Sequence, residues 1–138
     1  MNKEFIPHQQ ALELKELGFD EPCLFAFDNC STPMRCSNLR TNEQKFNGVN
    51  YNSSTYTSQP TFSQAFRWFR DKYKLQSYIR HECSNVEYYY DFVINEDVYD
   101  VIKDTCEEAE LACLRKLIDI VKKKIEIIWK QKKLQDLK

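Results

Sequence analysis

The chain has 138 residues, a length that fits one domain with a hydrophobic core of its own. Its 20 basic and 21 acidic side chains give a formal net charge of −1, which excludes a general electrostatic reason for binding nucleic acids or membrane surfaces. No run approaches the roughly 18 consecutive apolar residues of a membrane span. We therefore predict one soluble domain over residues 1–138.

A first helix is predicted at residues 7–17. Pro7 suits the first turn of a helix, because it lacks the N–H group that this turn leaves unpaired. Gly18 adopts a left-handed conformation easily, so it should end the helix. Phe19 should then fold back on Leu14.

The next segments are predicted to be a strand and a long polar excursion. Cys23–Phe27 is short, aromatic and preceded by Pro22, which is typical of a strand. Residues 29–60 are rich in Asn, Ser and Thr, so we predict a loop or an edge hairpin there. Within it, Asn47 and Gly48 favour a type I′ turn.

A second helix and a strand pair follow. Thr61 and Gln64 form a capping box that opens a helix running to Tyr73. Apolar and polar residues alternate in Leu75–Glu82 and Val86–Asn95, which is typical of two paired strands.

One face of this strand pair should be buried and the other largely wet, with Asp91 and Val93 on the wet face. Sheets with such faces are usually antiparallel and covered by helices on one side. The sequence therefore predicts an α+β fold, in which an antiparallel sheet of about four to five strands packs on three helices.

The last third of the chain predicts one long helix at residues 105–136. Thr105 and Glu108 form a second capping box at its start. At about 100° per residue, eight apolar side chains share one side of this helix, which we expect to face the core. They are Leu111, Leu114, Leu117, Ile118, Val121, Ile125, Ile128 and Trp129.

A second apolar seam recurs every seven residues on another side of the same helix, at Cys113, Ile120, Ile127 and Leu134. This spacing is typical of contact with another helix, so we predict that these residues bind a protein partner or a second copy of the chain. The alternative is a central helix that its own domain buries on both sides. Lys124 and Gln131 interrupt the seam, which favours the partner interpretation.

Charge is divided unevenly along the last part of the chain. Residues 87–110 contain nine acids and one base, whereas residues 111–138 contain nine bases and three acids. This order matches the dipole of a helix, so helix electrostatics alone explains it. A basic tail also allows an alternative function, nucleic-acid binding, because phosphate neutralisation needs several exposed cations. The lysines for that alternative are Lys122, Lys123, Lys124 and Lys130.

The sequence contains six cysteines but no clear motif for metal binding or catalysis. Zinc ligands could be drawn from several residues, but no Cys-x-x-Cys pair supplies a chelating half-site. His81 and Cys83 could serve as base and nucleophile, but no orienting third group is evident. We therefore expect no enzymatic activity, no metal and no cofactor. The zinc candidates are His8, Cys23, Cys30, Cys36 and Cys83.

The N-terminal residues contain no apolar run typical of a signal peptide. Disulfide-linked proteins usually belong to oxidising compartments, which secreted proteins reach through such a peptide. We therefore expect a cytoplasmic protein whose thiols are reduced.

Three segments resemble a known group of proteins. They are residues 10–23 (QALELKELGFDEPC), 62–73 (FSQAFRWFRDKY) and 107–118 (EEAELACLRKLI). Together they resemble a family of small, functionally uncharacterised proteins encoded by bacteriophages and prophages. The chain departs from that family at Lys74, where a glycine often ends the helix, and in its extended tail after Val121. The resemblance implies a phage-related source acting inside a bacterial host cell, and it carries no activity that could be transferred to particular residues.

These observations together predict a small, non-enzymatic accessory protein of phage type. It should bind a host factor or itself through the C-terminal helix. The alternative is a nucleic-acid-binding module that uses the lysine-rich part of the same helix.

Overall fold

The computed structural model describes residues 4–27, 33–35, 56–83 and 88–137 of the chain. The contacts within the chain divide it into two compact units, Met1–Trp68 and Phe69–Lys138. That these units form one domain over residues 1–138 stays a prediction. The division falls inside helix α2, Phe62–Tyr73. This helix therefore supplies its first half to one unit and its second half to the other.

The first unit contains α1, His8–Glu16, which ends as the sequence predicts. Gly18 has a φ of 91°, in the left-handed region, and its N–H donates to the carbonyl oxygen of Lys15 at 3.1 Å. The N–H of Phe19 donates to the carbonyl oxygen of Leu14 at 3.0 Å. These two bonds form a Schellman motif. The predicted glycine stop is therefore confirmed. Leu14 and Phe19 are both buried, so the motif also directs the following chain back to the helix.

The sheet of the first unit has three short antiparallel strands in the order β2-β1-β3. They are β1, Phe25–Phe27, β2, Pro33–Arg35, and β3, Thr57–Gln59. Phe27 in the central strand is buried, and so are the polar side chains of β3. Gln59 meets this burial with a hydrogen bond, because its Nε2 donates to the carbonyl oxygen of Ile6 at 3.0 Å. The turn predicted at Asn47 and Gly48 lies outside the described residues.

The helix α2 begins with the predicted cap. The N–H of Gln64 donates to Oγ1 of Thr61 at 3.1 Å, which satisfies one donor of the first turn. The Gln64 side chain turns to the loop after α1, where its Nε2 donates to the carbonyl oxygen of Pro22 at 2.7 Å. At its other end α2 is closed by Lys74, whose φ of 58° is left-handed although the residue is not glycine.

The second unit contains a meander of three antiparallel strands in the order β4-β5-β6. β4, Ser77–Cys83, and β5, Tyr88–Ile94, match the predicted strand pair. The third strand, β6, Asp97–Lys103, was not predicted. Asn95 and Glu96 make the turn before it, with φ values of 47° and 77° that suit a type I′ hairpin. Glutamate stands where glycine usually marks such a turn, so the sequence pattern does not reveal it.

The central strand β5 is buried on both faces from Asp91 to Ile94, so the prediction of a wet face is wrong for Asp91 and Val93. Arg80 lies opposite Asp91 in the register of β4 and β5. Its Nε donates to Oδ1 of Asp91 at 2.9 Å, and its Nη2 donates to Oδ2 at 2.6 Å. This bidentate ion pair lets a carboxylate stay inside the protein.

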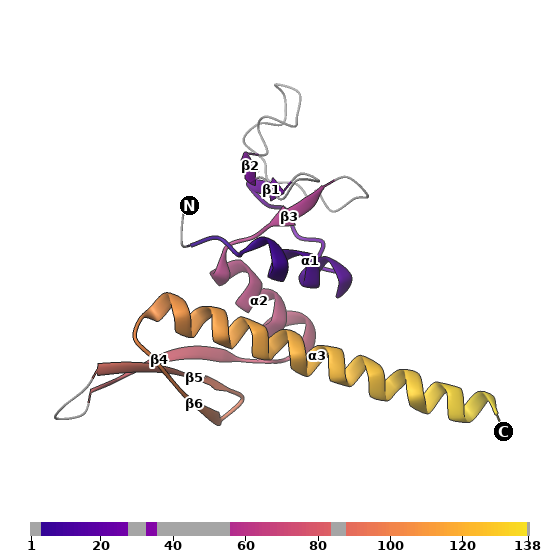
Figure 1. Ribbon diagram of the computed structural model, residues 1–138. Helices are drawn as coiled ribbons and strands as arrows, with labels where there is room; N and C mark the ends of the chain where they lie inside the picture. The colour runs from indigo at the N-terminus through magenta and orange to yellow at the C-terminus, as the bar shows by residue number, and fades with distance from the viewer. Residues whose placement is uncertain (1–3, 28–32, 36–55, 84–87, 138) are drawn as a thin grey trace. The chain divides into compact units, whose positions relative to one another are not determined.

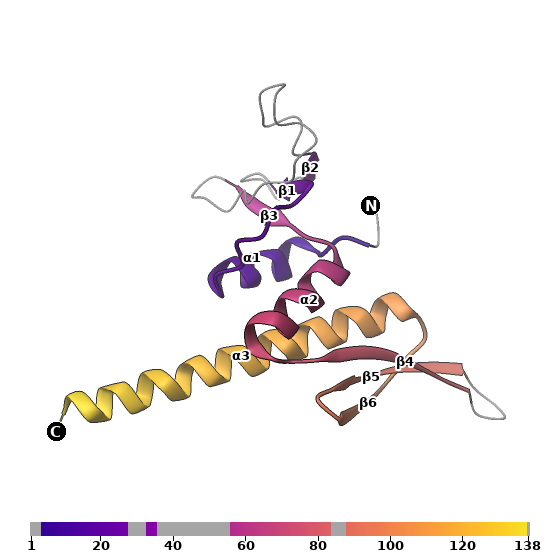
Figure 2. The ribbon, with the colours of Figure 1, turned by 180° about the vertical axis from the view of Figure 1, so that it is seen from behind.

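The long helix α3, Cys106–Asp136, covers one face of this sheet with its first half and extends past it with its second half (Figures 1 and 2). The N–H of Glu108 donates to Oγ1 of Thr105 at 3.2 Å, so the predicted start is confirmed. The ammonium of Lys116 lies 5.4 Å from the centroid of the Tyr99 ring, which joins the helix to β6. The buried residues of α3 are Ala109, Cys113, Leu114, Leu117, Ile118 and Val121.

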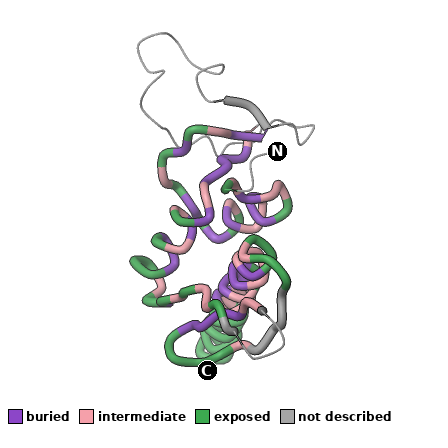
Figure 3. Tube along the Cα trace, turned by 90° about the vertical axis from the view of Figure 1, so that its left-hand side faces the viewer, coloured by how far each residue is buried: buried purple, intermediate pink, exposed green. Residues whose placement is uncertain are grey.

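Burial ends at Val121. None of the described α3 residues that follow it is buried, and Figure 3 shows the C-terminal end of the helix in the colour of exposed residues. The second half of α3 therefore does not pack into the hydrophobic core of its unit.

The predicted α+β class is confirmed, with three helices, antiparallel sheets and a long C-terminal helix in the described residues. The one larger sheet that we predicted is instead two sheets of three strands. β1 takes its partners from the first 60 residues, whereas β4, β5 and β6 pair only with their neighbours along the chain. No described strand therefore links the two sheets.

Candidate partner-binding surface on the C-terminal helix

The predicted seam is divided by the structure into a buried and an exposed part. Cys113 is fully buried and Ile120 is half-buried, whereas Ile127 and Leu134 are 55% and 63% exposed. Burial raises the pKa of the Cys113 thiol to about 12, and the negative charge of Glu110 adds to this increase. Cys113 therefore belongs to the core of its unit rather than to the open part of the seam, because it lies in the half of α3 that covers the sheet.

The stripe that we expected to face the core also continues past the sheet. Ile125 is half-buried, while Ile128 and Trp129 are 57% and 63% exposed, so the prediction of core positions for these two residues is wrong. Helical periodicity fixes which residues share a side, but not how far a neighbouring sheet extends along the helix.

Ile127, Ile128, Trp129 and Leu134 together form what we call the tail surface. Single exposed apolar residues are normal on a soluble protein, but four large ones within about two helical turns are not. Ile127 and Leu134 lie above one another at a spacing of seven residues, and Ile128 lies about 100° from Ile127 around the helix, at the edge of this row. Trp129 is two residues from Ile127, so it lies about 160° away around the helix.

Lysines surround the tail surface. Residues 122–138 contain seven lysines but only two acids, Glu126 and Asp136. The Nζ atom of Lys123 lies 3.1 Å from Oδ2 of Asp119, so this lysine is already paired within the helix. The remaining excess of positive charge attracts an acidic contact surface and repels a basic one.

The lysines of the alternative nucleic-acid site do not share one side of the helix. Lys122, Lys123 and Lys124 are consecutive, so at about 100° per residue they point in three directions. Lys123, Lys124 and Lys130 are exposed, and Lys122 is half-buried. A phosphate backbone passes along one side of a helix, so it could reach only part of this set.

Comparison with known proteins adds no relative. No protein-family model, no curated protein and no solved structure matches the chain. Function is therefore inferred from the geometry and charge of the chain itself. Within the part of the chain that the structure describes, no helix combines the length and the apolar character that a membrane crossing requires.

The residues considered for zinc or cysteine chemistry are not gathered into a site where the structure describes them. No group of three or more His, Cys, Asp or Glu side chains converges among the described residues. Cys23 is buried, and its thiol lies 3.8 Å from Oε1 of Gln64. His81 is exposed and stacks on Tyr90, with ring centroids 4.6 Å apart. Outside the described part lie Cys30, Cys36 and the side chain of Cys83.

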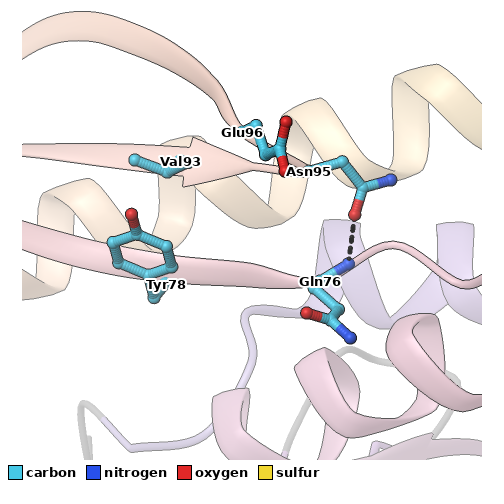
Figure 4. Close-up of a pocket in the computed structure, with 5 residues that line it drawn as sticks. All are labelled: Gln76, Tyr78, Val93, Asn95 and Glu96. Atoms are coloured by element: carbon cyan, nitrogen blue, oxygen red, sulfur yellow. Dashed lines mark hydrogen bonds between the residues drawn. The ribbon is translucent and has the colours of Figure 1, made fainter.

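A hollow of about 360 Å³ lies in the second unit where β4 begins and β5 ends (Figure 4). Oδ1 of Asn95 accepts a hydrogen bond from the N–H of Gln76 at 2.8 Å, and Nδ2 donates to the carbonyl oxygen of Lys74 at 3.2 Å. The Asn95 side-chain amide therefore uses both of its polar atoms to bind the segment between α2 and β4. The remaining lining residues, Tyr78, Val93 and Glu96, supply no nucleophile with a neighbouring base. The tail surface is therefore the stronger functional candidate.

Proposed function

We propose that this chain is a small, non-enzymatic accessory protein that binds a protein partner through the tail surface. The observation that carries the proposal is the exposure of Ile127, Ile128, Trp129 and Leu134, each more than half open, on the part of α3 that extends past the sheet. Fully burying an Ile or Leu side chain contributes about 1.5–3 kcal/mol, so covering the exposed part of each contributes about 1–2 kcal/mol.

A protein partner explains this surface better than nucleic acid does. Phosphate contacts use cations and hydrogen-bond donors, so they give no reason to expose three aliphatic side chains. A protein groove covers aliphatic side chains such as Ile127 and Leu134 and uses the lysines at its rim. The resemblance to phage-encoded proteins supports a partner in the bacterial host, and modulating or blocking a host factor would suit such a protein.

The test compares two doubly substituted variants of the full chain. Ile127→Asp with Leu134→Asp places two charges on the tail surface and should abolish co-purification of the partner from the producing cell. Lys132→Gln with Lys133→Gln makes the same change of two units in net charge, on exposed residues away from the seam and without removing an apolar side chain, so it should retain the partner.

Circular dichroism should show unchanged folding in both variants, because residues 127–135 are exposed. Partner loss in both variants, or in neither, would contradict binding through the tail surface. Light scattering of the wild type identifies the partner as a second copy if the mass is a multiple of the chain mass and falls in the first variant.

Nucleic acid remains the second candidate because Lys123, Lys124 and Lys130 are exposed. It predicts a mobility shift of DNA or RNA that weakens steeply with salt. Replacing Lys122, Lys123 and Lys124 together should abolish that shift. A shift that survives this replacement would remove the lysines from consideration.

A further inference from the structure

We propose that the occupant of the tail surface is an acidic amphipathic α-helix of the partner protein, docked on the side that carries Ile127, Ile128 and Leu134. This inference rests on the proposed function and adds the chemical class of the partner. Its basis is the pattern of charge beside the exposed part of the seam.

Lysines flank the exposed seam at the spacing of a helix pair. Lys123 and Lys130 stand four residues before Ile127 and Leu134, so each lies beside its apolar neighbour, one turn earlier. Lys124 stands three residues before Ile127 and lies on the opposite edge of the seam. In paired helices the residues beside the apolar seam choose the partner by charge. Lysines on both edges therefore select acidic residues on the facing helix.

The acids of the tail do not cancel this charge on the seam side. Asp136 lies about 160° from Leu134 around the helix, so it points away from the seam. Glu126 lies about 100° from Ile127, on the edge opposite Ile128, and is the one acid near the docked side. Asp119 does pair with Lys123, at 3.1 Å. Lys124 and Lys130 are then the principal cations that face a docked helix.

A second copy of the same tail fits this pattern poorly. Parallel copies would bring Lys124 against its counterpart, and antiparallel copies would bring the row of Lys123 and Lys130 against itself. Either arrangement places like charges beside a seam with only two or three apolar contacts. An acidic helix removes this repulsion and covers the same side chains.

The probe is a synthetic helical peptide about three heptads long, with leucine along its seam and glutamate on both flanks. It should bind the full chain, as anisotropy of a label on the peptide would show. A matched peptide with lysine in place of glutamate should bind at least about tenfold more weakly. Trp129 lies on the far side of the helix, so its fluorescence should keep the emission of an exposed indole.

Two charge-reversed variants of the chain test the side of docking. Lys124→Glu with Lys130→Glu reverses the two principal cations and should weaken binding of the acidic peptide by about tenfold or more. Lys132→Glu with Lys133→Glu makes the same change in net charge away from the seam, so it should weaken binding by no more than about threefold. Equal weakening in both variants would show attraction to net charge alone and would overturn the proposal.

Three further outcomes also overturn the acidic-helix assignment. They are failure of the acidic peptide to bind, displacement of the bound peptide by a DNA oligonucleotide of similar length, and a wild-type dimer that Ile127→Asp dissociates. If the peptide fails while the partner test with Ile127→Asp and Leu134→Asp succeeds, only the partner class is wrong. If both fail, the tail surface is not a binding site.

Discussion

Replacing Arg80 should destabilise the second unit by leaving a charge buried without its partner. Asp91 is 0% exposed, and Arg80 donates to both of its carboxylate oxygens, at 2.9 and 2.6 Å. In Arg80→Met the carboxylate keeps its burial and loses its counter-charge. Breaking a buried ion pair from one side costs about 3–5 kcal/mol; because the Arg80 side chain is 37% exposed and water can approach from there, we expect about 2–3 kcal/mol.

Substitutions on the other side of the pair separate charge from packing. Asp91→Leu leaves Arg80, whose guanidinium can turn toward water, so the loss should be only about 1 kcal/mol. The double variant, Arg80→Met with Asp91→Leu, removes both charges and should lie within about 1 kcal/mol of the wild type. The cycle of four proteins then isolates the interaction between the two side chains.

Urea denaturation followed by circular dichroism measures these differences. For a unit of this size a loss of 2–3 kcal/mol lowers the midpoint by about 1 M or more. A loss below about 0.5 kcal/mol in Arg80→Met, or an equal loss in Asp91→Leu, would refute the role of the buried charge.

Four further measurements test local features. Gly18→Ala should cost about 1–2 kcal/mol in thermal unfolding because a φ of 91° disfavours any side chain, and an unchanged melting temperature would contradict this. Lys74→Gly should leave stability unchanged or raise it by up to about 1 kcal/mol, since glycine accepts a φ of 58°; a clear loss would show that the lysine side chain matters more than the backbone. Thr105→Ala should cost about 1 kcal/mol, with Thr105→Ser as the control that keeps the acceptor. Cys113, whose thiol pKa is about 12, should resist alkylation near pH 8 until urea is added, as mass spectrometry of its peptide would show; rapid labelling without urea would contradict its burial.

The helix ends could be predicted because their causes are local. Gly18 and Thr105 act on backbone groups within a few residues, so their hydrogen bonds follow from the sequence alone. β6 was not predicted because the local signal of its turn is missing from the sequence. Its turn at Asn95 and Glu96 has two positive φ angles but contains no glycine. The acidic residues that follow the turn are also typical of the region before the N-terminus of a helix.

The environment of β5 and of the tail could not be predicted, because it depends on distant parts of the chain. A charge such as Asp91 suggests a wet face, and only the strand register reveals that Arg80 lies opposite. Periodicity likewise placed Ile128 and Trp129 on the side of the core residues, but the reach of the sheet decides where coverage stops. The lysines around these two residues were the only sequence feature indicating that this part of the helix is exposed to solvent.

The anchored first half of α3 has a kinetic consequence for recognition. A free peptide must form its first turn before a helix can grow, and this step is unfavourable. In α3 the packed segment up to Val121 supplies that turn permanently, so the remaining residues only extend a helix that already exists. A partner therefore encounters a helix that is already formed. The association rate should then be limited by diffusion and electrostatic steering rather than by folding of the tail.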